Sequence, residues 1–132
     1  MPCLETLEFR EMAVDSNVIE KIGLCKKLKT LAFTDCGIDR NAMKTLVGLP
    51  LALNRLMLED PNLDRETLLQ LPRMKSLNHL ILRDLPIEIG GSTINKLKRG
   101  MPNCRIEVKF EDGSVIEVSG ASEMLGPSAP EL

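Results

Sequence analysis

The stretch from Leu28 to Leu58, LKTLAFTDCGIDRNAMKTLVGLPLALNRLML, decides the fold because one short pattern occurs in it twice. A leucine is followed three positions later by a second leucine, and two positions after that by another apolar residue. Looking outward from this stretch, the same triplet occurs once before it and once after it. Successive triplets begin 24, 25 and 24 residues apart, at Leu4-Leu7-Phe9, Leu28-Leu31-Phe33, Leu53-Leu56-Leu58 and Leu77-Leu80-Leu82.

Each triplet is followed by apolar residues at helical spacing, as at Ile19, Ile22 and Cys25. A change of apolar period from two to about 3.6 predicts a strand, a turn and a helix. An aspartate stands just before each of the first three helical stretches, where its carboxylate can cap the helix. We therefore predict units at about 4–27, 28–52, 53–76 and 77–103, with helix N-caps at Asp15, Asp39, Asp64 and, in the altered fourth unit, Ser92.

The C-terminal part of the chain predicts a β-hairpin over 104–118. Ile106, Val108 and Phe110 alternate, and Glu111-Asp112-Gly113 suits a three-residue loop with glycine in the left-handed conformation. This loop pairs Val108 with Ile116 and Ile106 with Val118, whereas a two-residue loop would place the apolar residues on opposite faces. Residues 119–132 lack periodicity and are predicted to be a disordered tail.

The repeated triplet, completed by Cys36 at the ninth position, matches L-x-x-L-x-L-x-x-N/C and resembles the leucine-rich repeat (LRR) family over residues 4–110. The resemblance implies an α/β solenoid over 1–110, a right-handed superhelix with a short parallel sheet on its concave face and helices outside. The hairpin would close it. Residues 101–106 resemble the closing segment of arrays in larger bacterial proteins. The shared role of the family is protein–protein binding, so we expect a partner protein of unknown identity.

Composition narrows the function classes. The chain has 43% hydrophobic residues, a net charge of −2, three Phe and no Trp or Tyr. Its charges are interspersed without a basic run, so nucleic-acid binding is not predicted. A run of 18 apolar residues and a leader pattern are both lacking, which predicts a soluble protein without a membrane partner. Four cysteines without a C-x-x-C pair predict reduced core residues and a cytoplasmic location: Cys3, Cys25, Cys36 and Cys104.

We predict neither an enzyme nor a cofactor or metal site. His79 is the one histidine, and it occupies an outward position in the fourth strand without a partner at ligand spacing. Gly90-Gly91-Ser92 lacks the pattern of a phosphate loop and more simply adjusts a helix start.

The candidate binding site is the concave sheet face. Its central row is Glu8, Ala32, Met57 and Ile81, of which the last three form an apolar strip. The flanking positions are Thr30, Arg55 and His79 on one side, and Thr34, Glu59 and Arg83 on the other. Exposed apolar residues are also tolerated on sheets without function. The alternative role is therefore a structural spacer or capping segment that binds no partner of its own.

Two further features have open interpretations. The acidic ladder Glu11, Asp35, Asp60 and Asp84 predicts either Asx-turn hydrogen bonds in each turn or a bound cation or basic partner. At the N-terminal end, the first unit has no polar cap before it, whereas repeat arrays need one. We expect exposed apolar side chains there, and hence either a longer array or a homodimer through this end, at Leu4, Leu7, Phe9, Ile19 and Ile22.

Overall fold

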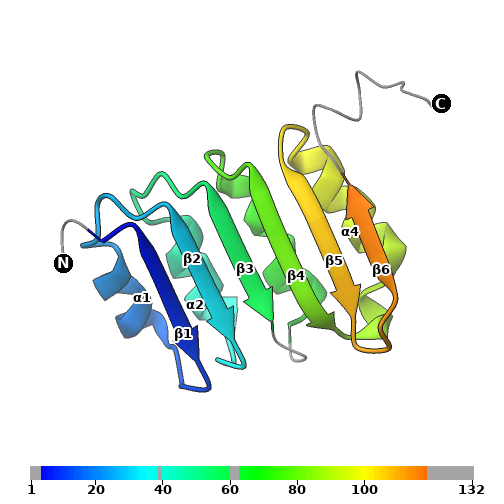
Figure 1. Ribbon diagram of the computed structural model, residues 1–132, viewed down its shortest axis with the longest axis horizontal. Coiled ribbons are helices and arrows are strands. Elements are labelled where there is room, and N and C mark those ends of the chain that lie inside the picture. Colours follow the sequence, from blue (N-terminus) through cyan, green and yellow to red (C-terminus); the bar gives the residue numbers. More distant parts are fainter. Residues whose placement is uncertain (1–3, 39, 60–62, 119–132) are drawn as a thin grey trace.

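Six strands form one sheet in the order β1-β2-β3-β4-β5-β6 in the computed structural model, which describes residues 4–38, 40–59 and 63–118 (Figure 1). The first five strands are parallel, and β6 is antiparallel to β5. A largely parallel sheet with helical crossovers makes this an α/β fold. The strand bounds are β1 Thr6–Arg10, β2 Thr30–Thr34, β3 Arg55–Glu59, β4 His79–Leu85, β5 Arg105–Phe110 and β6 Val115–Val118.

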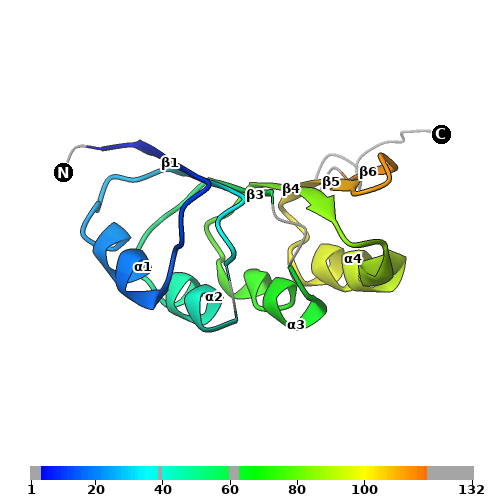
Figure 2. The same cartoon turned by 90° about the horizontal axis from the view of Figure 1, so that it is seen from below.

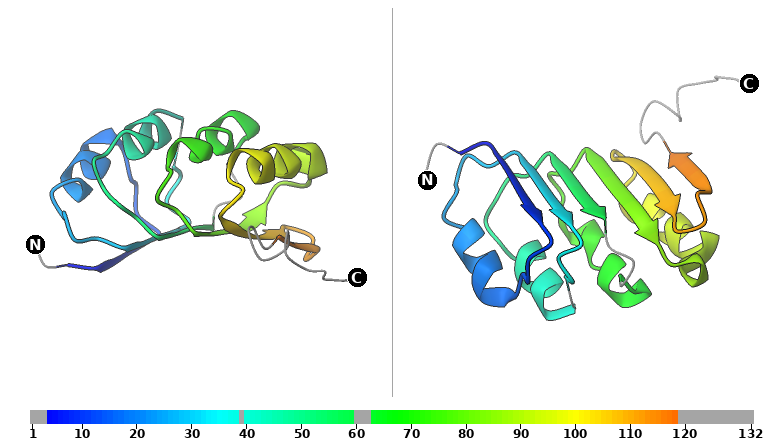
Figure 3. Two further views of the ribbon diagram at one scale, coloured as in Figure 1. Left: turned by 90° about the horizontal axis from the view of Figure 1, so that it is seen from above. Right: turned by 60° about the horizontal axis from the view of Figure 1, so that its bottom comes forward.

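The helices all lie against the same face of the sheet (Figures 2 and 3). They connect successive parallel strands, and in two of these connections a short 3-10 helix follows or precedes the α-helix. Among the described residues, none of the helices is long and apolar enough to cross a membrane. Their bounds are α1 Ser16–Ile22, α2 Arg40–Val47, α3 Arg65–Leu68, η1 Leu71–Arg73, η2 Ile87–Ile89 and α4 Gly90–Gly100.

The register of the sheet aligns the leucine triplets. Leu7 pairs with Leu31, Leu31 with Leu56, and Leu56 with Leu80, and Ile106 of β5 continues the row. From β2 to β5 these side chains are fully buried between sheet and helices. Each such leucine or isoleucine removed from water stabilises the fold by roughly 2 kcal/mol. The core is therefore a continuous layer that neighbouring strand–helix units share.

Two of the predicted helix caps are confirmed and one is wrong. The carboxylate of Asp15 accepts a hydrogen bond from the Val18 amide at 3.1 Å, and that of Asp64 accepts one from the Thr67 amide at 2.7 Å. Asp39 lies outside the described residues. Ser92 is not a cap, because α4 already begins at Gly90, whose φ of 71° turns the chain out of η2. Glycine adopts this left-handed conformation at little cost.

The acidic positions at the strand ends have a conformational explanation. Glu11, Asp35 and Asp84 have φ values of 51°, 53° and 61°, in the left-handed region that Asp tolerates better than most residues. The Asx-turn hydrogen bonds expected at these carboxylates are not among the contacts of the described residues. Within residues 4–38, 40–59 and 63–118, no group of three or more His, Cys, Asp or Glu could hold a metal ion. Asp60 lies outside these ranges.

The C-terminal hairpin has the predicted register. Val108 pairs with Ile116 and Ile106 with Val118, and Gly113 has a φ of 93° in the connecting turn. Ile106, Val108 and Phe110 are buried on the helix side, and Ile116 packs against the core. The hairpin therefore extends the apolar layer by one parallel and one antiparallel strand. The predicted tail, 119–132, lies outside the described residues.

The N-terminal end of the sheet is only partly covered. Leu4, Leu7 and Phe9 are half-buried, although their partners in β2 are fully buried. The expectation of exposure was wrong for Ile19 and Ile22, because α1 turns both side chains toward α2 and the sheet. The partly exposed apolar side chains of this end are thus those of Leu4 and of β1.

The described cysteines are core residues, as predicted. Cys25, Cys36 and Cys104 are free and buried, whereas Cys3 lies outside the described residues. Burial raises the pKa of the Cys104 thiol to about 11, which keeps it protonated and unreactive at neutral pH.

The cap at Asp64 generates a stability prediction. Hydrogen bonds from Thr67 are the main reason that the pKa of Asp64 lies below its ordinary value of 3.8, and the Arg40 guanidinium adds to the shift. Asp64→Ala should lower the free energy of unfolding at neutral pH by about 1 kcal/mol. A lowered folded-state pKa gives stability that is present above pH 3.8 and is lost as the pH falls below it. The difference between wild type and Asp64→Ala should therefore shrink in acid.

Urea denaturation at neutral and acidic pH measures this difference, with Glu88→Ala as the control because Glu88 is an exposed carboxylate outside a cap. Equal losses in the two variants would contradict the capping role.

Candidate functional site on the open face of the sheet

Figure 3 shows the face of the sheet turned away from α1–α4, here called the open face. The strand register brings the predicted site residues together on it. Its central row follows the register Glu8, Ala32, Met57, Ile81 and Glu107 across β1–β5. One flanking row, at the strand starts, is Thr30, Arg55, His79 and Arg105. The other flanking row, at the strand ends, contains Thr34, Glu59 and Arg83. All nine residues predicted for partner binding therefore lie on this face.

The apolar strip in the centre is narrower than predicted. Ala32 and Met57 are partly exposed, but Ile81 is only 4% exposed and cannot serve as an open contact. Its neighbours on the open face are Met57 and Glu107 by register, and His79 and Arg83 by alternation along β4. Long side chains on all four sides shield a central residue, which a single-strand pattern does not reveal.

An imidazole–carboxylate pair lies beside Ile81. His79 Nε2 hydrogen-bonds to Glu107 Oε2, and Arg105 Nε lies 3.7 Å from the same oxygen. The hydrogen bond to His79 is the main cause that holds the pKa of Glu107 below its usual value, and the positive charges of Arg105 and Arg55 add to it. Glu107 is thus ionised at neutral pH and ties β4 to β5. The sequence pattern missed Glu107 because β5 departs from the leucine triplet and its register was needed to place it.

The charges that are interspersed in the sequence separate in the fold. Parallel strands all begin at one edge of the sheet, so the segments that lead from a helix end into the next strand share that edge (Figure 1). These segments are 21–30, 44–55, 71–79 and 96–105, and they contain twelve of the seventeen Lys and Arg residues and none of the nineteen Asp and Glu residues. We call this the basic edge. The lack of a basic run in the sequence therefore does not prevent positive charge from collecting at one edge of the fold.

The opposite edge, where β1–β5 end, is rich in carboxylates. It includes Glu11, Asp35 and Asp84 at the strand ends and Asp15 and Asp64 at the helix starts. The helix dipole favours acidic residues at the helix starts, and the left-handed turns favour Asp at two of the strand ends. Charge separation follows from the alternation of strand and helix.

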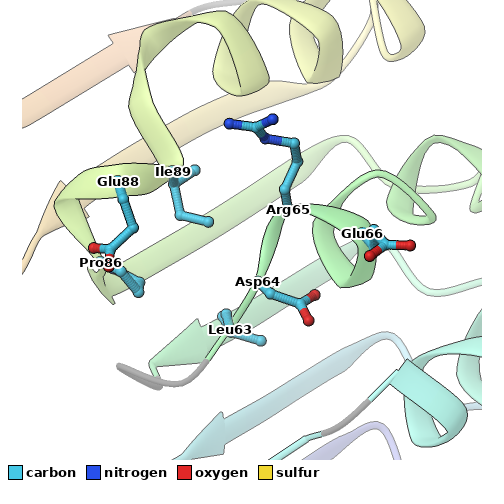
Figure 4. A pocket seen from close by; sticks show the side chains of 7 residues that line it. All are labelled: Leu63, Asp64, Arg65, Glu66, Pro86, Glu88 and Ile89. Atoms are coloured by element: carbon cyan, nitrogen blue, oxygen red, sulfur yellow. The ribbon is translucent and has the colours of Figure 1, made fainter.

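A groove of about 560 Å³ lies on the acidic edge between α3 and η2 (Figure 4). Asp64, Arg65 and Glu66 line one side, and Pro86, Glu88 and Ile89 line the other. Two of its carboxylates already have partners, because Arg40 lies 3.6 Å from Asp64 and 2.9 Å from Glu66. The other described residues of the lining offer no constellation of nucleophile and base.

The chemistry of the open face suits contact with another surface. The Thr30 and Thr34 hydroxyls can donate and accept hydrogen bonds, the exposed Arg55 and Arg83 can pair with carboxylates, and Met57 adds apolar area.

The chain matches no protein-family model, and neither curated proteins nor solved structures show a significant match to it.

The different burial of Ile81 and Met57, which are neighbours in the central row, predicts that an aspartate at each position lowers stability by a different amount. Ile81→Asp should lower the free energy of unfolding by about 3 kcal/mol or more, because the new carboxylate would be buried without a partner. Met57→Asp should cost about 1 kcal/mol or less, because Met57 is partly exposed. Chemical denaturation of both variants measures the contrast. Similar losses at the two positions would show that Ile81 is as accessible as Met57.

Proposed function

We propose that this chain is a segment of a leucine-rich repeat solenoid and that it binds a partner protein through the open face, on the concave side of the array. The strand offsets of 24, 25 and 24 residues along Leu7, Leu31, Leu56 and Leu80 support the first part, because equivalent residues of a repeat stack in this way. The longer protein to which such a segment belongs would be a signalling or regulatory one.

The uncovered face carries the second part of the proposal. Parallel sheets nearly always have both faces covered, because crossover helices lie on each side. Among the described residues, α1–α4 all lie on one side of the sheet and none of them covers the other face, which supports binding of a partner there by the parallel strands β1–β5. Partly exposed Ala32 and Met57 beside Arg55 and Arg83 give that face an apolar centre with a polar rim, the anatomy of many protein interfaces.

The proposed role is binding and not catalysis, in a reducing compartment such as the cytoplasm. His79, the one imidazole of the chain, is engaged by Glu107 in a contact that joins two strands. The free, buried thiols of Cys25, Cys36 and Cys104 fit a protein that does not depend on disulfides.

Capture of partners on the immobilised protein tests the open-face role. Met57→Asp should lose a partner that the wild type retains, because a carboxylate would replace the apolar centre of the face. Ile87→Asp is the matched control, since Ile87 is an exposed apolar residue on η2, away from the open face. A partner retained equally by Met57→Asp would contradict binding at this face, and the absence of any retained protein would favour the spacer role. Ile81→Asp is unsuitable because its fold should be weakened.

The N-terminal end offers a second surface, for a second copy of the chain or a further unit of the array. Glu5 O and Glu11 N bond to β2, so by alternation the backbone groups of Thr6, Glu8 and Arg10 point away from the sheet. Half-buried Leu7 and Phe9 lie at the same edge. Sedimentation over a dilution series should show reversible dimers if the second copy is the occupant, and a monomer at every concentration would exclude it.

A further inference from the structure

The basic edge concentrates positive charge to a degree that the net charge of the chain conceals. The chain carries −2 overall, yet each of the twelve cationic side chains of this edge is exposed, and the four segments that contain them, 21–30, 44–55, 71–79 and 96–105, hold no Asp or Glu. The residues are Lys21, Lys26, Lys27, Lys29, Lys44, Arg55, Arg73, Lys75, Lys96, Lys98, Arg99 and Arg105.

Helix stability explains only some of these residues. Lys21, Lys44 and Lys98 lie in the last turns of their helices, where a positive charge is favourable against the helix dipole. That effect fades beyond the last turn, but Lys26, Lys27, Lys29 and Lys75 lie in the loops that follow. Repulsion between like charges disfavours this clustering, and contact with an anionic surface would relieve that repulsion.

A groove divides the basic edge between its third and fourth segments. It has a volume of about 320 Å³ and is lined by apolar residues that include Pro72, Met74, Met101 and Pro102, with Lys75 also in the lining. The groove is narrow because α4 ends close to η1: a Cβ atom on Gly100 would lie 2.9 Å from Pro72 Cβ. It can receive a small apolar side chain next to a positive charge.

The basic edge is continuous with the open face. Arg55 and Arg105 begin β3 and β5, so they belong to both surfaces, and they flank His79 in the row at the strand starts. A partner that lies across the open face would therefore meet the loop lysines where it passes the strand starts.

We propose that the basic edge binds an acidic segment of the partner protein, a stretch of carboxylates with an apolar residue that enters the groove between η1 and α4. This inference rests on the proposed open-face function and names the chemistry of the partner. Carboxylates would pair with the lysines and arginines, and the groove would add the apolar contact that fixes the segment in register.

An acidic peptide fits these features better than a nucleic acid does. Sequence-tolerant nucleic-acid binding uses aromatic side chains on which bases stack. The chain has no Trp or Tyr, Phe33 and Phe110 are buried, and Phe9 stacks on Phe33 with ring centroids 5.4 Å apart. A phosphate backbone also offers nothing apolar to the groove.

Anisotropy of a fluorescent oligoglutamate peptide with a central leucine, titrated with the full chain, tests the proposal. Lys27→Glu/Lys75→Glu should weaken binding at low salt by about tenfold or more, because two favourable charges become repulsive. The matched control, Arg40→Glu/Arg65→Glu, makes the same change in net charge on α2 and α3, away from both the basic edge and the open face, and should weaken binding by less than about twofold. Raising the salt concentration should weaken wild-type binding.

Several results would overturn the proposal. They include no binding of the peptide at low salt, equal losses in the two double variants, or tighter binding of an oligonucleotide of equal charge. Tighter binding to phosphatidylserine vesicles would also overturn it and would assign the edge to a membrane, with Leu24 as a 72% exposed apolar anchor among lysines. The open-face function is judged separately by the capture experiment with Met57→Asp, so failure of one leaves the other intact.

Discussion

The parallel backbone ladder is the constraint on which the rest of this structure depends. Just before each of β1, β2 and β3, one carbonyl accepts two successive amides at the start of the next strand. Glu5 O bonds to Lys29 N and Thr30 N at 2.8 and 3.0 Å, and Lys29 O bonds to Asn54 N and Arg55 N at the same two distances. The same pair of hydrogen bonds recurs at the next strand, where the Asn54 carbonyl accepts the amides of Asn78 and His79. These repeated pairs of hydrogen bonds fix the register between neighbouring strands, and with it the alignment of the leucines between the sheet and the helices.

The same offset also organises the surface. Because every strand begins at one edge and ends at the other, any residue type favoured at a helix start accumulates on one side of the molecule, and any type favoured after a helix end accumulates on the opposite side. The result is a protein of small net charge with strongly different edges and, between them, a sheet face that none of the described helices covers. Hydrogen bonds such as that between His79 and Glu107 then link strands across that face. The chemistry of the surface therefore depends on how the strands are aligned in the sheet and not on any single strand.

Sequence reasoning succeeded where a feature depends on neighbours along the chain. The leucine triplets gave the strand pairing, the aspartate caps gave two helix starts, and the loop at Gly113 gave the register of the hairpin. Sequence reasoning failed where a feature depends on residues that are close in space but distant along the chain. Ile81 is buried by side chains from three strands, and the clustering of lysines is visible only once the helix ends are aligned. Ser92 was misplaced because Gly90 allowed an earlier helix start through a conformation that the pattern does not encode.

Hydrogen exchange of the backbone amides tests the central claim most directly, which is that strand–helix units are stable only through the ladder and core that they share. The account predicts that the ladder amides of β2, β3 and β4 exchange with one common free energy of opening, equal to that of global unfolding. The outward amides of Thr6, Glu8 and Arg10 in β1 should exchange faster. Separate opening free energies for successive units, or equal protection of the outward β1 amides, would contradict it.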